Sequence, residues 1–257
     1  NRRICCSKVN SDSHHLLQTL FFSLIMLMKR FPLISCITPT RNRHGFLSDM
    51  IAMFLAQTYP NKELIIIDDS PFPFPGVDSL PPSVNYQFIH TKNPLSIGHK
   101  RNLAVSLSNG EYIAFMDDDD FHGKKRLSLQ MNTILRTKCD VLTPKKIFFN
   151  DVTKPVRSCS VFTISSKFTK TVFWNGYITP CMIFKKNLFK FNKFRNVSLG
   201  EDSLFIKDLL RIKKIRICSH SILSPSHFMY SIHQSNTWNL IIPLHERLKS
   251  TYLQTCI

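Results

Sequence analysis

Residues 95–120, which read LSIGHKRNLAVSLSNGEYIAFMDDDD, decide the fold. Residues 97–107 predict a helix, and Asn109-Gly110 is a typical helix stop. Residues 111–116 then predict a buried strand, which runs directly into four consecutive aspartates at residues 117–120. The stretch therefore predicts a helix followed by a strand, with a cluster of carboxylates where the strand ends.

The residues before this stretch repeat the alternation of strand and helix. Residues 33–38 (LISCIT) and 63–67 (ELIII) predict buried strands, and residues 46–55 between them have an amphipathic helix pattern. Residues 85–90 (NYQFIH) predict a further strand. This order indicates a single α/β domain with a mostly parallel central sheet flanked by helices.

The residues after the aspartates have a less regular pattern. Residues 162–165 and 181–184 predict short strands. Residues 201–212 predict a helix, and Ser198 and Glu201 have the spacing of a capping box at its start.

The chain is strongly basic, with a formal net charge of +17 over 257 residues. Ten basic side chains fall within residues 185–216, interleaved with apolar ones. The structural interpretation is a solvated basic face, and the functional interpretation is a surface that contacts a membrane or an acidic polymer. No helix-turn-helix, RNA-binding or zinc-finger pattern is present, so nucleic acid is not expected as a partner.

The eight cysteines lack the spacing of zinc or redox motifs, and several, such as Cys36 and Cys181, lie in apolar runs. This pattern favours free buried thiols and a cytoplasmic location, with association at a membrane surface as an addition. Residues 16–28 are apolar, but they are too few to cross a bilayer comfortably. We interpret the residues before Met28 as an extension outside the fold.

Acidic residues follow two of the predicted strands, at Asp68-Asp69 and at residues 117–120. Ligands of parallel sheets bind where the strands end. In extended backbone, Asp117 and Asp119 would share one face. Neighbouring carboxylates repel one another unless a cation neutralises them, so one pair can hold Mg²⁺ or Mn²⁺. A solvated acidic turn is the alternative.

Other candidate residues are cationic groups, a carboxylate and a histidine. Lys100 and Arg101 open a predicted helix and could offset phosphate charge. Asp202 is not needed for the cap and is free to act as a general base. His233 is a candidate phosphate or metal ligand, although a lone histidine is more often structural.

Taken in order, these motifs resemble family-2 glycosyltransferases of the GT-A fold, which is Rossmann-like. The resemblance covers about residues 33–236 through PLISCITPTRNR, LAQTYPNKELIIIDDS, LSIGHKRNLAVSLSNGEYIAFMDDDD, CMIFKKNLF and LGEDSLFIKDLL. It implies metal-dependent transfer of a sugar, with inversion, from a nucleotide-sugar to an acceptor hydroxyl. A UDP-sugar is the expected donor, and a glycan, protein or lipid is the expected acceptor.

The resemblance also implies a role for each matching position. Asp119, with Asp117 and His233, would hold Mn²⁺ or Mg²⁺ in a DxD motif. Asp202 would be the catalytic base, in a motif with Glu201. Trp174 and Gly176 would border the acceptor. The nucleotide-sugar would lie against Thr38, Pro39, Arg41, Asp68, Asp69, Lys100, Arg101, Asp117 and Asp118.

The same resemblance suggests how the chain is divided. Residues 1–30 would lie outside the fold, residues 31–120 would form the nucleotide-binding half, residues 121–240 the acceptor half, and residues 241–257 a tail. The sequence departs from the family pattern after Asp69, where the common glycine is missing, and in residues 121–125. Two other classes remain open: a sugar nucleotidyltransferase, and an inactive GT-A-like or basic module that binds an anionic polymer or membrane.

Overall fold

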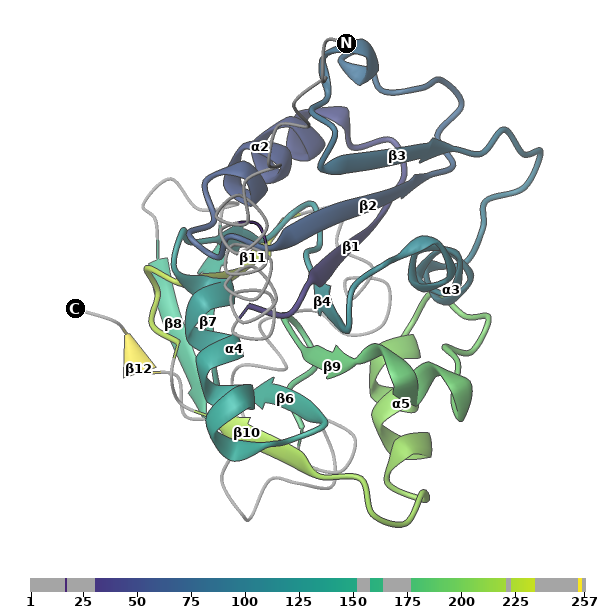
Figure 1. Cartoon of the computed structure of the whole chain (residues 1–257). Coiled ribbons are helices and arrows are strands. Elements are labelled where there is room, and N and C mark those ends of the chain that lie inside the picture. The colour runs from purple at the N-terminus through teal and green to yellow at the C-terminus, as the bar shows by residue number, and fades with distance from the viewer. Residues whose placement is uncertain are drawn as a thin grey trace, which may run out of the picture. The chain divides into compact units, whose positions relative to one another are not determined.

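The computed structural model describes Leu17 and residues 31–151, 158–163, 177–220, 223–233 and 254–255. From Leu33 onward, these residues form one compact unit that contains two sheets and four α-helices (Figure 1). Trp174, Gly176 and the end of the strand predicted at residues 162–165 lie outside the described residues. No helix in the described part is both long and apolar enough to cross a membrane.

The central sheet has seven strands in the order β10-β6-β9-β4-β1-β2-β3. All neighbours run parallel except β9, which is antiparallel to β4 and β6. The expected mostly parallel sheet is therefore confirmed. Its strands are β1 (Ile34–Thr40), β2 (Lys62–Asp68), β3 (Val84–Phe88), β4 (Tyr112–Phe115), β6 (Val141–Pro144), β9 (Ile183–Lys185) and β10 (Ile217–His220).

Helices cover both faces of this sheet, with α3 and α5 on one side and α2 and α4 on the other (Figure 1). The core under α3 and α5 contains Ile37, Phe115, Phe184 and Phe205, all nearly or fully buried. The helix predicted at residues 97–107 is confirmed with the same bounds. The helices are α2 (His44–Leu55), α3 (Ile97–Leu107), α4 (Arg126–Thr137) and α5 (Glu201–Leu209), with short 3₁₀ turns η1 (Val77–Ser79) and η3 (Lys186–Lys190).

A second, five-stranded sheet was not predicted from the sequence. Its strand order is β12-β8-β7-β11-β5, and only β7 and β11 pair in parallel. The helix α4 was also missed, although Leu127, Met131 and Ile134 stand at helical spacing. The strands are β5 (Phe121–His122), β7 (Lys146–Asp151), β8 (Ser158–Thr163), β11 (Phe228–Ile232) and β12 (Gln254–Thr255).

The predicted capping box at the start of α5 is wrong. The N-cap is Gly200, with φ +70°, and no side chain caps the helix. The Ser198 hydroxyl instead accepts a hydrogen bond from the amide of Ile97, 3.3 Å away, and the Glu201 side chain is turned inward to Arg101. The expectation of free thiols is confirmed for the described cysteines Cys36, Cys139, Cys181 and Cys218.

Candidate active site

The candidate site lies at the edge of the central sheet where β1, β2 and β4 end, which we call the carboxyl edge. These three strands are parallel and adjacent, so their carboxyl ends meet. Both acidic clusters singled out from the sequence lie there, together with the first turns of α2 and α3.

Asp68 and Asp69, at the end of β2, are buried, and both carboxylates accept hydrogen bonds from the protein. Asp68 accepts hydrogen bonds from Ser70 and, at 2.7 Å, from the hydroxyl of Tyr86. Asp69 accepts from the amide of Leu95 at 2.6 Å. Two buried carboxylates are stable only when they are satisfied in this way. They hold the loop between β3 and α3 against the site.

Lys100 connects the ends of β1 and β2. Its ammonium group donates to the carbonyl of Thr40 at 2.9 Å and to Oδ1 of Asp69 at 2.8 Å. Burial lowers the pKa of Lys100, although the hydrogen bond and charge of Asp69 oppose this shift. On the other side, Arg41 also bonds Asp69 and keeps 30% of its side chain exposed. Lys100 therefore acts within the protein, and Arg41 is the cation of this pair that a ligand can reach.

Residues 117–120 form a turn, not the extended strand end that the sequence suggested. The amide of Asp120 lies 3.4 Å from the carbonyl of Asp117, and β4 ends at Phe115. The predicted alternation of faces is therefore wrong. Asp118 and Asp119 both contact Arg43, whereas Asp117 contacts Arg101. Asp120 is buried and accepts a hydrogen bond from the amide of Ser231 at 3.0 Å, which ties the turn to β11.

Arg43 lies between two of these aspartates. Its Nη1 is 3.0 Å from Asp118 and 2.7 Å from Asp119. Asp118 also accepts a hydrogen bond from the hydroxyl of Thr40 at 2.6 Å. Burial and the charge of Asp119 raise the pKa of Asp118 to about 6. Burial acts in the same direction on Asp119, but the hydrogen bond from His233 and the charge of Arg43 bring its pKa below the ordinary value.

His233 meets Asp119, with 3.0 Å between Nε2 and Oδ2. It lies directly after β11, and its ring packs on Phe46 of α2 with ring centroids 5.0 Å apart. An imidazole beside a carboxylate is a ligand pair that suits Mn²⁺, and such sites take further ligands from phosphates and water. Within the described ranges, no group of three or more His, Cys, Asp and Glu side chains is arranged to hold a metal. Asp119 and His233 are the pair of potential ligands that lie together here, and the same Oδ2 of Asp119 also contacts Arg43 at 2.7 Å.

Arg101 joins the aspartate turn to the first turn of α5. Its Nε donates to Glu201 at 3.1 Å and its Nη2 lies 3.0 Å from Asp117. The guanidinium carbon lies 3.8 Å from the centre of the Phe115 ring. Its Nη1 is buried and has no hydrogen-bond partner among the described residues. Burial and the charge of Asp202 raise the pKa of Glu201 to about 7, in spite of the opposing charge of Arg101.

Asp202 follows Glu201 but is only half-buried. It accepts hydrogen bonds from the hydroxyl of Thr179 at 2.5 Å and from the amide of Ser203 at 2.6 Å. A carboxylate that is fixed by two donors and still reached by solvent can accept a proton from a bound hydroxyl. Glu201 cannot do this in the same way, because its side chain is buried against Arg101.

The structure brings most of the residues singled out from the sequence to this edge. Thr38 is buried and donates to the carbonyl of Met116 at 2.6 Å, and Pro39 is paired in the sheet with Ile67. Sequence reasoning missed the contributions of Thr40, Arg43, Thr179 and Tyr86. Arg43 could have been found from the sequence, because it is the second arginine of the PTRNR motif. No sequence pattern marked Thr179 or Tyr86.

The comparison with protein families finds a matching family model. The model of the family described as Glycosyl transferase family 2 matches residues 35–198. The match includes both acidic clusters and ends before Glu201 and Asp202.

Similar proteins agree with this match. An uncharacterized glycosyltransferase of Haemophilus influenzae is 26% identical over 75% of this chain and 78% of its own length. The poly(ribitol-phosphate) beta-glucosyltransferase of Bacillus spizizenii is 28% identical over 72% of this chain, which spans 30% of that enzyme.

Among solved structures, S. aureus TarS 1-349 in complex with UDP-GlcNAc has a TM-score of 0.60 and 22% identity, over 79% of this chain and 59% of that one. This likeness confirms the expected GT-A fold. The family match covers more than half of the sequence, so this chain belongs to glycosyl transferase family 2.

Proposed function

We propose that the protein transfers a sugar from a UDP-sugar to an acceptor hydroxyl, with inversion at the anomeric carbon. The observation that carries this proposal is the position of Arg101. One buried side chain contacts both Asp117 and Glu201, so the aspartate turn and the half-buried Asp202 belong to one site. A site with donor-binding carboxylates beside a candidate base is what sugar transfer requires.

Relatives support the choice of donor. TarS was solved with UDP-GlcNAc and with UDP, and the enzyme of Bacillus spizizenii is a glucosyltransferase. In this chain, Asp68 and Asp69 would shape the pocket for the base together with Thr38, Pro39 and Lys100. These residues are buried or paired in the sheet, so we assign them positioning roles. Arg41, Arg43 and Asp117 keep exposed side-chain atoms and are the groups that a nucleotide can touch.

A divalent cation fits the site. Asp119 and His233 would hold Mn²⁺ or Mg²⁺. When bound, the ion would neutralise charge on the departing diphosphate. Asp119 is paired with Arg43 and Asp117 with Arg101, so an ion at either carboxylate would displace an arginine contact, and Asp117 stays a further candidate ligand.

The remaining chemistry belongs to the protein's own residues. Asp202 accepts the proton of the acceptor hydroxyl, and the hydroxyl oxygen attacks the anomeric carbon. The bond from that carbon to the diphosphate oxygen breaks, and UDP leaves with the electron pair. Arg43 stabilises the negative charge that develops on the leaving group. Thr179 holds Asp202 in place. Trp174 and Gly176 stay proposals for the acceptor side, as does the class of acceptor, a glycan, protein or lipid.

Nucleotide binding tests this proposal directly. Isothermal titration of the purified chain with UDP, GDP and CDP, each with and without Mn²⁺, should show binding of UDP that Mn²⁺ strengthens. An Asp119→Asn variant should lose the Mn²⁺ effect, and Asp49→Asn, an exposed aspartate on α2, is the matched control. The proposal fails if the folded protein binds no nucleotide, or if release of pyrophosphate reveals a nucleotidyltransferase.

A further inference from the structure

The edge of the central sheet opposite the candidate active site is built from strand starts. Backbone hydrogen bonds join Lys186 to Glu111, Lys185 to Asp140 and Asp140 to Arg216, which brings together the starts of β4, β6 and β10 and the end of β9. We call this region, together with the helix ends that reach it, the amino edge. Nothing in the proposed chemistry uses it.

Each α-helix of the described residues ends near this edge with an exposed leucine. Helices that connect parallel strands run from the carboxyl edge back to the amino edge. These leucines come from helices on both faces of the sheet. Phe191, just after η3, is 70% exposed. The leucines are Leu55, Leu107, Leu135 and Leu210.

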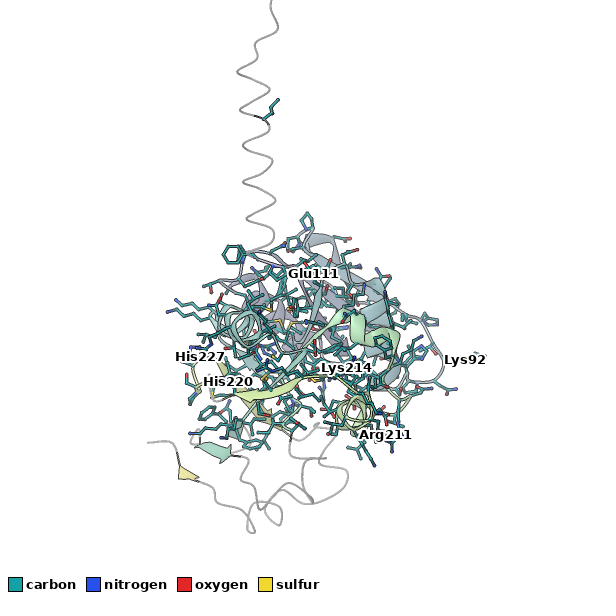
Figure 2. All side chains as sticks on the ribbon, turned by 60° about the horizontal axis from the view of Figure 1, so that its bottom comes forward. Lys92, Glu111, Arg211, Lys214, His220 and His227 are labelled. Atoms are coloured by element: carbon teal, nitrogen blue, oxygen red, sulfur yellow. The ribbon has the colours of Figure 1, made fainter. Side chains whose placement is uncertain are left out.

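The same edge is strongly basic. Arg211 and Lys214 follow α5 in the chain and are exposed, and both are labelled in Figure 2 together with Glu111. Acidic groups nearby are mostly neutralised: Asp140 is paired with Lys185 at 2.9 Å, and Asp208 with Arg195 and Arg211. The exposed basic side chains are Arg136, Lys138, Lys190, Arg211, Lys213, Lys214 and Arg216.

A cavity opens within this basic region. It has a volume of about 530 Å³ and lies between the start of β4 and η3. Its lining combines cationic and aromatic groups, which suits a phosphate attached to an apolar body. Six of the lining residues are Glu111, Tyr112, Lys185, Lys186, Phe189 and Lys190.

We propose that the amino edge docks on a lipid bilayer that contains anionic lipids. Basic side chains with exposed Phe and Leu beside them are typical of surfaces that lie in the membrane interface. An acidic polymer or nucleic acid would satisfy the charges but would leave Phe191 and Leu210 in water, so the exposed apolar residues favour the bilayer. β1 also begins at this edge, and the apolar sequence of residues 16–28 precedes it in the chain. The proposal does not depend on the proposed function.

Flotation of the full chain with vesicles tests the proposal. The chain should float with vesicles of 70% phosphatidylcholine and 30% phosphatidylglycerol, and not with phosphatidylcholine alone. Each basic residue near such a surface strengthens binding about five-fold. The triple variant Lys190→Gln, Lys213→Gln, Lys214→Gln should therefore bind about 100-fold more weakly at low salt.

Matched variants distinguish vesicle binding by the amino edge from binding caused by net charge or by the apolar sequence of residues 16–28. Lys92→Gln, Lys145→Gln, Lys146→Gln removes three exposed charges outside the amino edge and should retain binding. Phe191→Ala should weaken binding several-fold, whereas Phe72→Ala, at an equally exposed ring in the proline-rich loop, should not. Equal binding by the two triple variants would overturn the proposal. So would retention on heparin or DNA that exceeds vesicle binding and is indifferent to Phe191.

Discussion

Arg43 shows at the scale of single residues how the site keeps four neighbouring aspartates together. The turn at residues 117–120 would be unstable if its charges faced one another, and the protein distributes them instead. Asp118 and Asp119 both pair with Arg43, Asp117 pairs with Arg101, and Asp120 is buried against the backbone of β11.

Arg43→Met should therefore destabilise the fold by about 2–4 kcal/mol, because it leaves two largely buried carboxylates without their cation. Urea unfolding measures the change, and Arg136→Met, at an exposed arginine of α4, should cost less than about 0.5 kcal/mol. Similar losses in both variants would show that Arg43 is not paired as described.

Glu201 should make stability depend on pH. Its pKa is raised from 4.5 to about 7 in the folded protein, first by burial and then by the charge of Asp202. The folded state then holds the proton more tightly than the unfolded state, so this group stabilises the fold less as the pH rises from 4.5 through 7. Between pH 5 and pH 8, wild type should lose about 2.5 kcal/mol more stability than Glu201→Gln. Urea unfolding at the two pH values checks this, and parallel losses in both proteins would contradict it.

At the scale of elements, α3 connects the parts of the candidate site. Its first two turns carry Lys100 and Arg101, which reach β1, β2, the aspartate turn and α5. The helix was predicted with the correct bounds, although its C-cap is Ser108, in an extended conformation, and not Asn109-Gly110. The partners of Arg101 were not predictable, since burial decides them and the sequence carries no record of which carboxylate a cation faces. The capping box failed for the same reason: Ser198 has the right spacing but bonds to the start of α3.

Close packing of α3 against the chain that follows η3 gives a sharp prediction. A Cβ added to Gly98 would lie 1.9 Å from the carbonyl oxygen of Arg195, which is backbone and cannot move aside cheaply. Gly98→Ala should destabilise the protein by about 2 kcal/mol or more. Gly45→Ala is the control, because it lies in α2 with nothing within 4 Å, and it should be neutral or stabilising by up to about 1 kcal/mol. Equal melting temperatures for the two variants would show that this contact is absent.

At the scale of the whole molecule, the two edges of the central sheet present different side chains. The carboxyl edge holds paired carboxylates and cations around a candidate base, and the amino edge presents exposed basic and apolar side chains. The alternation of strands and helices in the sequence was enough to predict this sheet and the edge at which the acidic clusters lie. It was not enough to predict the second sheet, because β5 and β11 are short and pair with residues about a hundred positions away. Pairing of that kind depends on tertiary contacts and not on local pattern.

The most direct test of the central claim is the rate at which Asp202→Asn releases UDP from UDP-glucose and UDP-N-acetylglucosamine, with water as the acceptor. If Asp202 is the base, the variant should release UDP at least about 100-fold more slowly than wild type. Its dissociation constant for UDP should stay within about threefold, because Asp202 contacts Thr179 and Ser203 and not the carboxylates of the aspartate turn. Asp49→Asn should behave as wild type. A fully active Asp202→Asn protein would contradict the account, because the proposed mechanism assigns the acceptor proton to Asp202 alone.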